Sequence, residues 1–304
     1  MYIESFVLPS VKEENKLIAK RMKENGGEKR EYRYIDNVYP CNLFPEKGLH
    51  ELSFAGITIF YGGNGSGKST LLNLISSKLE LNRIAPFNSS ELFDRYAEKC
   101  KFTLGYDDEG FQHRIPNGSR IITSDDIFDY MLTVRTNNAE ISEEIEEGKT
   151  EWVKRKYGET VQFKGMEHYE DLRLQIMARS KSLTRRQFIR RTAGQEVKLF
   201  SNGETALSYF DTKLKNDTLY CLDEPENSLS PGLQLKLQNM LEEMTRYCSC
   251  QFIIATHSPF LLAMNGARIY DLDESPVVIK NWWELENVKE YYRFFAKHKE
   301  LFEP

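Results

Sequence analysis

A glycine-rich segment constrains the fold of this chain more than any other feature. The apolar run Ile59-Phe60-Tyr61 leads into the loop Gly62–Ser69, and an amphipathic pattern then continues to Leu79. The loop has the spacing GxxxxGKS, in which glycines let successive backbone N–H groups curl around a phosphate. A helix that starts there adds its positive end to the same anion. The sequence therefore predicts a strand, a phosphate-binding loop and a helix in succession.

The predicted nucleotide-binding residues are Gly62, Gly63, Asn64, Gly65, Ser66, Gly67, Lys68, Ser69 and Thr70. Lys68 is expected to reach the β- and γ-phosphates of a nucleoside triphosphate, and the Ser69 hydroxyl is expected to ligate Mg²⁺. The alternative is an ordinary glycine turn with a solvated lysine. The apolar strand directly before the loop argues against that alternative.

Composition narrows the class of protein. The chain has 304 residues, 40% of them hydrophobic, which is enough for one large domain or two. A formal net charge of -5 argues against a chain that binds nucleic acid over its whole surface, although a local basic face is compatible with it. The five cysteines are odd in number and scattered, so a reducing cytoplasm fits best. No apolar run is long enough to span a membrane, and the first residues indicate a β-strand rather than a signal peptide.

The chain changes character along its length. Apolar runs alternate with amphipathic helical pattern in Phe54–Leu79 and Leu219–Leu272, as expected for an α/β core. Residues 81–195 between them are polar, with an acidic stretch at Glu140–Glu151. A basic run follows it: Arg173, Arg179, Lys181, Arg185, Arg186, Arg190 and Arg191. We therefore expect a single domain, 1–304, whose core comprises 1–80 and 196–304, with 81–195 inserted as a mostly helical lid or arm. Lys12–Arg33 is expected to be a surface hairpin or loop.

Two further apolar runs end in residues that suit phosphate chemistry. Thr218–Pro225 ends in the carboxylates Asp223 and Glu224, where a parallel sheet opens onto its ligand. Asp223 is expected to hold Mg²⁺, and Glu224 to orient or deprotonate the attacking water. Adjacent side chains on a strand point to opposite faces, so Glu224 must lie at a bend for both to reach one site. A third strand, starting at Gln251, ends near His257. Its imidazole could contact the γ-phosphate, or could simply bond a loop carbonyl.

A short turn before Ala206–Phe210 leaves two interpretations open. Ser201 and Glu204 have the spacing of a capping box, which indicates a well-capped helix without a ligand. An exposed helix start with serine and glycine also suits a second phosphate.

Together these motifs resemble the ATP-binding-cassette ATPase superfamily, over nearly the full chain. The sequence of two motifs, Asp223-Glu224-Pro225-Glu226-Asn227 and Ala255–Pro259, is more similar to the soluble branch of SMC-type, recombination-repair and phage-defence ATPases than to transporter subunits. It is similar to a small bacterial group of AAA-family, SMC-like ATPases. The resemblance implies an α/β P-loop NTPase core of ABC type, with a mostly parallel sheet, an N-terminal antiparallel β region and an inserted helical lid.

The resemblance also implies a mechanism: ATP and water give ADP and phosphate, with Mg²⁺ as cofactor and with Lys68, Glu224 and His257 as catalytic residues. Two copies are expected to form a head-to-tail homodimer on ATP binding. Each ATP then lies between one phosphate loop and the signature turn of the other copy. That turn comprises Ser201, Asn202, Gly203 and Glu204.

The chain departs from the family pattern at several positions. Asn202 stands where the first of two signature glycines is usual, and Glu204 replaces a glutamine. No glutamine ends a strand in the middle region, so Asp125 or Asp126 is the candidate for that metal or water contact. Tyr39 or Phe44 is the candidate for the adenine face.

Three functions compete at this stage. The first is a soluble ATP-driven switch that acts on nucleic acid or on a separately encoded partner protein, in genome maintenance or phage defence. The basic run motivates the nucleic-acid version, although a solvated lid face or contacts to the nucleotide explain it equally well. The second, the ATP-binding subunit of a membrane transporter, is disfavoured by the atypical signature and by Thr256–Pro259. The third is a binding module with little hydrolysis, against which Glu224 argues.

The C-terminal tail is rich in aromatic residues. They are Trp282, Trp283, Tyr291, Tyr292, Phe294 and Phe295. We expect them to pack on the core of the chain, with docking of a partner as the alternative.

Overall fold

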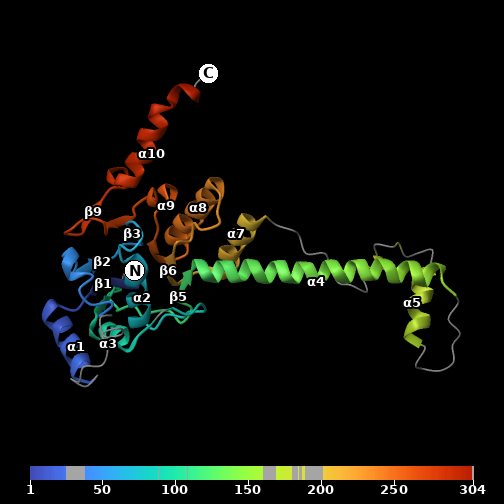
Figure 1. Ribbon diagram of the computed structural model, residues 1–304, viewed down its shortest axis with the longest axis horizontal. Helices are drawn as coiled ribbons and strands as arrows, with labels where there is room; N and C mark the ends of the chain where they lie inside the picture. Colours follow the sequence, from blue (N-terminus) through green and yellow to red (C-terminus); the bar gives the residue numbers. More distant parts are fainter. Residues whose placement is uncertain are drawn as a thin grey trace. The chain divides into compact units, whose positions relative to one another are not determined.

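A computed structural model describes residues 1–24, 38–87, 89–107, 109–159, 169–179, 184, 187–188 and 201–302 (Figure 1). The chain divides into two compact units. Unit 1 comprises Met1–Phe128 with Ala206–Pro304, and unit 2 comprises Asp129–Thr205. Each unit is described by itself below.

A six-stranded sheet forms the centre of unit 1. Its strand order is β5-β6-β7-β3-β8-β9, and all neighbours are parallel except the antiparallel pair β8 and β9. The strands are β3 (Ile57–Tyr61), β5 (Arg120–Thr123), β6 (Leu219–Asp223), β7 (Gln251–Ala255), β8 (Arg268–Asp271) and β9 (Val278–Lys280). All residues of β3 and β7 are buried, which is why they read as continuous apolar runs. The expected mostly parallel sheet is confirmed.

A second, antiparallel sheet in unit 1 has the order β2-β1-β4. Its strands are β1 (Ile3–Val7), β2 (Glu51–Ser53) and β4 (Lys101–Leu104). Ser5 pairs with Ser53 on one side of β1 and with Thr103 on the other. The expected N-terminal β region is therefore confirmed.

The prediction of a surface hairpin or loop for Lys12–Arg33 is wrong where the structure describes this segment. Helix α1 covers Val11–Glu24 instead. Ser10 donates from its backbone N–H and its hydroxyl to Glu13 Oε2, at 2.8 and 2.7 Å, and so caps the helix start. Leu17 is buried, which fixes the helix on the core. The dense charge of the segment hid this pattern. Residues 25–33 lie outside the described residues.

Helices pack on the central sheet of unit 1. Helix α2 (Lys68–Lys78) contacts β5, β6, β7 and helix α3 (Glu91–Lys99), while α8 (Pro231–Tyr247) contacts β7 and α9 (Pro259–Leu262). A short 3-10 helix, η1 (Pro45–Lys47), lies before β2. Phe60, Leu72 and Phe93 are fully buried in the core that results.

The C-terminal segment does not pack on the core as expected. It comprises η3 (Trp282–Glu284), α10 (Glu286–Lys297) and η4 (Lys299–Leu301). Among the described residues of η3 and α10, Val288 alone is buried. Leu285, which lies between the two helices, is buried as well. Trp283 is 56% exposed and Tyr292 75% exposed. Packing on the core is thus the wrong explanation for these aromatic residues.

Unit 2 contains helix α5 (Tyr169–Arg179) and most of α4 (Ser124–Tyr157). Within it Arg155 lies 2.6 Å from the Asp171 carboxylate and donates to the Asp171 carbonyl at 2.8 Å. Helix α7 (Asn202–Lys213) returns the chain to unit 1. No described helix is long and apolar enough to cross a membrane.

The predicted insert, 81–195, begins earlier than unit 2 does. Residues 81–128 belong to unit 1 because Ile121 and Ile122 are buried on β5, which pairs with β6, and because Tyr96 of α3 is fully buried. Of the basic run, Arg173 contacts Glu170, and Arg179 donates to the Gly158 carbonyl at 2.7 Å. Lys181, Arg185, Arg186, Arg190 and Arg191 lie outside the described residues.

Candidate nucleotide site

The glycine loop joins β3 to α2 and depends on its glycines. Gly67, directly before α2, has φ 101°, and a Cβ there would lie 3.2 Å from Leu43 Cδ2. Gly62 is tighter still, because a Cβ would lie 2.6 Å from Ser66 Oγ. The Ser66 hydroxyl is buried and has no hydrogen-bond partner among the described residues. A curled loop with an unsatisfied hydroxyl is chemically suited to a phosphate.

Lys68 supplies the positive charge of the loop. Its side chain is 5% exposed, and Nζ donates to the carbonyls of Gly62 at 2.7 Å and Gly63 at 3.0 Å. The ammonium group is therefore held against the backbone of the loop rather than in solvent. It can exchange these carbonyls for phosphate oxygens without leaving the site.

Ser69 and Asp223 meet at the carboxyl end of β6, where Ser69 Oγ donates to Asp223 Oδ1 at 3.0 Å. Burial raises the pKa of Asp223 to about 6, helped by the charge of Glu224 and opposed by the hydrogen bond from Ser69. No group of three or more acidic, histidine or cysteine side chains that could hold a metal occurs in the described part of the chain. Mg²⁺ commonly binds one or two protein oxygens together with phosphates, and this pair fits that arrangement.

Glu224 follows Asp223 at a bend in the backbone, as the sequence required. Its φ is 48°, a left-handed conformation that is uncommon for a residue with a side chain. Its N–H donates to the Ala255 carbonyl at 2.9 Å, and Asn227 Nδ2 donates to its carboxylate at 3.2 Å. The bend lets two successive carboxylates serve one edge of the sheet.

His257 lies on the turn after the neighbouring strand, β7. Its Nδ1 is 3.9 Å from Glu224 Oε1 and 3.6 Å from Glu226 Oε1, and its side chain is 48% exposed. The histidine therefore faces the carboxylates at the end of β6 while remaining accessible to a ligand.

Comparison with known proteins agrees with this geometry. The family model described as ABC transporter matches residues 51–227, more than half of the chain. The chain belongs to the ATP-binding-cassette family. It is an ATPase of the P-loop type. A second family model, described as an AAA domain of the AbiEii toxin kind (Type IV TA system), matches residues 194–263. No curated protein matches the chain.

Several solved structures are similar to this ATPase. The SMC head domain from Thermotoga maritima is 13% identical, with 92% of this chain and 99% of that chain covered and a TM-score of 0.39. The Smc head domain of Pyrococcus furiosus, bound to the C-terminal domain of ScpA, is 14% identical over 80% of this chain and 95% of that one, with a TM-score of 0.38. A dimeric ATP-binding cassette with ADP and phosphate is 14% identical over 76% and 88%, with a TM-score of 0.34.

Glu226 is a residue of this ATPase that the sequence analysis did not single out. It is 5% exposed, and its Oε1 accepts from Thr256 Oγ1 at 2.6 Å and from the His257 N–H at 3.1 Å. Ser258 N–H also donates to it, at 3.2 Å. Glu226 thus fixes the turn that carries His257. The one feature of the sequence that could have indicated this role is the position of Glu226 within the Asp223–Asn227 motif.

Two other residues of the ATPase reach the site from late in the chain. The Asp273 carboxylate, after β8, accepts from the Gly63 N–H at 2.8 and 3.0 Å. Asn287 of α10 donates from Nδ2 to the His257 carbonyl at 3.1 Å, and from its N–H to the Tyr61 hydroxyl at 3.2 Å. No sequence pattern indicated either contact, because each partner is distant along the chain.

Four candidates fall outside this cluster or remain unassigned. Asp126 is 5% exposed, and its carboxylate accepts from the Ala85 N–H at 2.9 Å and the Thr123 N–H at 2.7 Å. It therefore caps α4, and its prediction as a metal ligand is wrong. Asp125 is exposed and lies two residues after Thr123, which pairs with Asp223 between β5 and β6. Its contact to the metal or the water stays a prediction. Phe44 is fully buried, which excludes it from an adenine face. Tyr39 donates to Thr70 Oγ1 at 2.9 Å.

The signature turn begins α7 and belongs to unit 2. The Ser201 N–H and hydroxyl each donate to Glu204 Oε2 at 2.9 Å, and the Glu204 N–H donates back to Ser201 Oγ at 3.3 Å. The predicted capping box is confirmed. A role of Ser201, Asn202, Gly203 and Glu204 opposite a second nucleotide stays a prediction.

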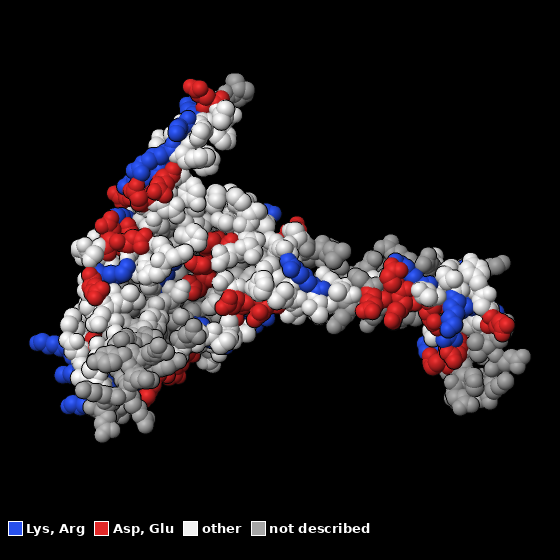
Figure 2. Space-filling view, viewed as in Figure 1, with Lys and Arg blue, Asp and Glu red and all other residues white. Residues whose placement is uncertain are grey.

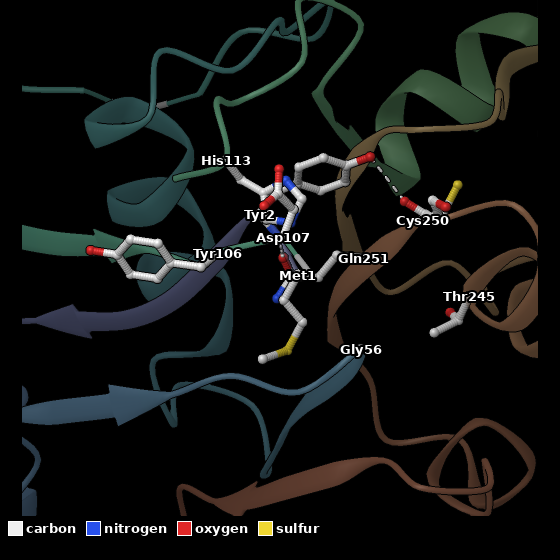
Figure 3. A pocket seen from close by; sticks show the side chains of 10 residues that line it. Met1, Tyr2, Gly56, Tyr106, Asp107, His113, Thr245, Cys250 and Gln251 are labelled. Carbon is white, nitrogen blue, oxygen red and sulfur yellow. Dashed lines mark hydrogen bonds between the residues drawn. The ribbon is translucent and has the colours of Figure 1, made fainter. Parts of the chain in front are cut away.

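A cavity of about 310 Å³ lies elsewhere in unit 1, at the amino ends of the parallel strands (Figure 3). Its wall includes Tyr2, whose hydroxyl donates to the Ser249 carbonyl at 3.0 Å, and Gln251, whose Oε1 accepts from the Tyr2 and Ile3 N–H groups. These polar groups already satisfy one another. The cavity contains none of the predicted site residues.

Proposed function

We propose that this ATPase is a nucleotide-gated switch in which Mg²⁺-dependent ATP binding joins two copies head to tail and hydrolysis separates them. One observation carries the proposal: Lys68, Ser69, Asp223, Glu224 and His257 gather at the carboxyl ends of three adjacent parallel strands. The Ser69–Asp223 contact of 3.0 Å and the His257–Glu224 separation of 3.9 Å supply its geometry.

The proposed roles follow from the contacts. Lys68 and the N–H groups of the loop bind the phosphates, while Ser69 and Asp223 hold Mg²⁺. When bound, Mg²⁺ neutralises charge on the β- and γ-phosphate oxygens. Glu224 orients or deprotonates the attacking water, and His257 contacts the γ-phosphate. Positioning of this kind supplies most of the catalysis in phosphoryl transfer.

The second half of each site comes from the other copy, through Ser201, Asn202, Gly203 and Glu204. A serine at a helix start offers a hydroxyl and N–H groups to a phosphate, provided that Glu204 yields its hydrogen bonds. The switch acts on a separate macromolecule, either nucleic acid or a partner protein. Five free cysteines suit a reducing cytoplasm.

The Glu224→Gln variant tests the proposal. Because the amide cannot deprotonate water, we expect turnover to fall by about 100-fold or more while ATP binding persists. A dimer then accumulates with ATP on gel filtration and disappears when ATP is replaced by ADP. Hydrolysis at the normal rate in this variant would show that the catalytic assignment is wrong.

A second measurement addresses the target. Steady-state ATPase rates with and without DNA or RNA at low salt distinguish nucleic acid from a protein partner. Binding through phosphates weakens steeply as salt is added. Absence of both binding and stimulation would exclude the nucleic-acid version.

A further inference from the structure

Helix α10 presents an aromatic face that no described residue of unit 1 covers. Tyr292 is 75% exposed, Phe294 59% and Phe295 52%, while Phe302 just beyond the helix is 65% exposed. The rings contact one another, with 5.4 Å between the centroids of Phe294 and Phe295 and 6.0 Å between those of Phe295 and Phe302. Exposed apolar patches of a few hundred Å² or more commonly mark interaction sites.

The charged residues of α10 lie on the other side of the helix. At 100° per residue, Lys289, Arg293 and Lys297 fall on one face together with Glu286 and Glu290. Figure 2 shows the Lys and Arg side chains in a row along one side of α10 and uncharged side chains along the other. Arg293 pairs with Glu286 at 2.7 Å.

This distribution selects the kind of occupant. Single-stranded nucleic acid is bound where cations and aromatic rings share a groove, whereas here they are segregated. A helix for anionic membranes carries a predominantly basic polar face, whereas two glutamates share this one. A protein surface fits best.

The base of α10 lies at the nucleotide site. Asn287 bonds both the His257 carbonyl at 3.1 Å and the Tyr61 hydroxyl at 3.2 Å, and Tyr61 is the last residue of β3 before the phosphate loop. Leu285, the residue directly before α10, is fully buried and anchors the helix start. A molecule that contacts the half-exposed His257 side chain therefore also lies near the start of α10.

The size of the patch indicates how it is used. Aromatic side chains bury about 150–250 Å² each, so the exposed parts of Tyr291, Tyr292, Phe294, Phe295 and Phe302 offer roughly 600 Å² per copy. Two copies then bury about 1,200 Å², the lower limit of a stable interface. Such a contact needs a second one beside it, and a shared nucleotide supplies that.

We propose that the aromatic face of α10 packs against the second copy of this chain in the ATP-bound pair. The proposal rests on the nucleotide-gated dimer proposed above and adds a contact surface to it. Asn287 then connects the contact surface to the turn of His257.

The test is made in the full chain with Glu224→Gln, which preserves the ATP-bound pair. The variant carries Tyr292→Ser, Phe294→Ser and Phe295→Ser in addition, all at side chains that are more than half exposed. We expect its dimer dissociation constant with ATP, measured by sedimentation velocity, to rise at least about tenfold. ATP binding to the monomer, measured at low protein concentration, stays within about twofold. A matched control carries Lys289→Ser and Lys297→Ser on the charged face and dimerises as the parent does.

The outcomes separate the two proposals. If Glu224→Gln alone stays monomeric with ATP, the nucleotide-gated dimer is wrong and the α10 contact falls with it. If Glu224→Gln dimerises and the serine variant dimerises equally well, the α10 proposal is overturned and the switch stands. If the serine variant dimerises normally but no longer binds anionic vesicles or single-stranded DNA, the α10 proposal is also overturned. Circular dichroism melting shows whether the serine variant is folded. The single variant Tyr292→Ser perturbs the fold less, and we expect it to weaken the dimer in the same direction.

Discussion

Helices α2 and α10 are nearly equal in length, at 11 and 12 residues, yet they use their side chains in opposite ways. Six residues of α2 are buried: Lys68, Leu71, Leu72, Leu74, Ile75 and Ser76. In α10 only Val288 is buried within the described part of the chain. Both helices begin at the edge of the sheet where the candidate nucleotide site lies. The difference shows that α2 buries its apolar side chains inside the chain, whereas α10 leaves its aromatic side chains exposed.

The largest test of this comparison is one truncation in each helix. Leu74→Ala in α2 removes a fully buried side chain, and we expect it to lower the free energy of unfolding by about 2–5 kcal/mol. Tyr292→Ala in α10 should change it by less than about 0.5 kcal/mol, because the ring is 75% exposed. Urea unfolding of the monomer without nucleotide measures both. A large loss for Tyr292→Ala would mean that α10 is part of the core.

A second test concerns the first residue of α2. Lys68→Ala removes the buried ammonium group at the phosphate loop, and we expect kcat/KM for ATP to fall about 100-fold or more. Lys78→Ala is the matched control at the other end of the helix, where Nζ donates to the Glu98 carbonyl at 2.8 Å, and it should stay within about twofold. Equal losses in the two variants would show that α2 charge in general, rather than Lys68, supports turnover. Binding of a fluorescent nucleotide shows whether Lys68→Ala loses affinity first.

The smallest effect is expected where α10 meets the site. Asn287→Ala removes the hydrogen bond to the His257 carbonyl, worth about 1 kcal/mol, so kcat should fall about fivefold with the KM for ATP little changed. Asn281→Ala, which removes the hydrogen bond from Asn281 Nδ2 to Glu284 Oε2 at the start of η3, is the control and should leave kcat unaltered. Steady-state kinetics of the two variants decide the matter. An unchanged kcat for Asn287→Ala would separate α10 from the catalytic turn.

Much of the geometry of the candidate nucleotide site was predictable because its signals are local. The phosphate loop depends on glycines at fixed spacing, and Asp223 with Glu224 directly follows a buried strand. The bend at Glu224 was also expected, since two successive carboxylates cannot otherwise face one site. The capping box of Ser201 and Glu204 spans a single helical turn. Each of these patterns requires only a few consecutive residues.

The failures have a common physical cause. Asp126 was a candidate ligand, but its carboxylate is engaged by Ala85, far away in the sequence. Phe44 looked like an available aromatic ring, yet it is fully buried. The prediction of a surface hairpin or loop for Lys12–Arg33 was wrong where the structure describes the segment, because its high charge masked a helix whose Leu17 is buried. Burial depends on what packs against a residue, and local composition does not report it.

By itself the sequence determined that this chain is a P-loop ATPase, and it predicted which residues bind the nucleotide, because the phosphate loop and the strand ends are made of contiguous residues. Only the tertiary structure decided that Glu226 fixes the turn of His257, that Asp273 holds Gly63 and that Asn287 joins α10 to the site. It also decided that the aromatic tail is exposed rather than packed. These features depend on contacts between residues that are far apart in the chain, and folding alone brings such residues together.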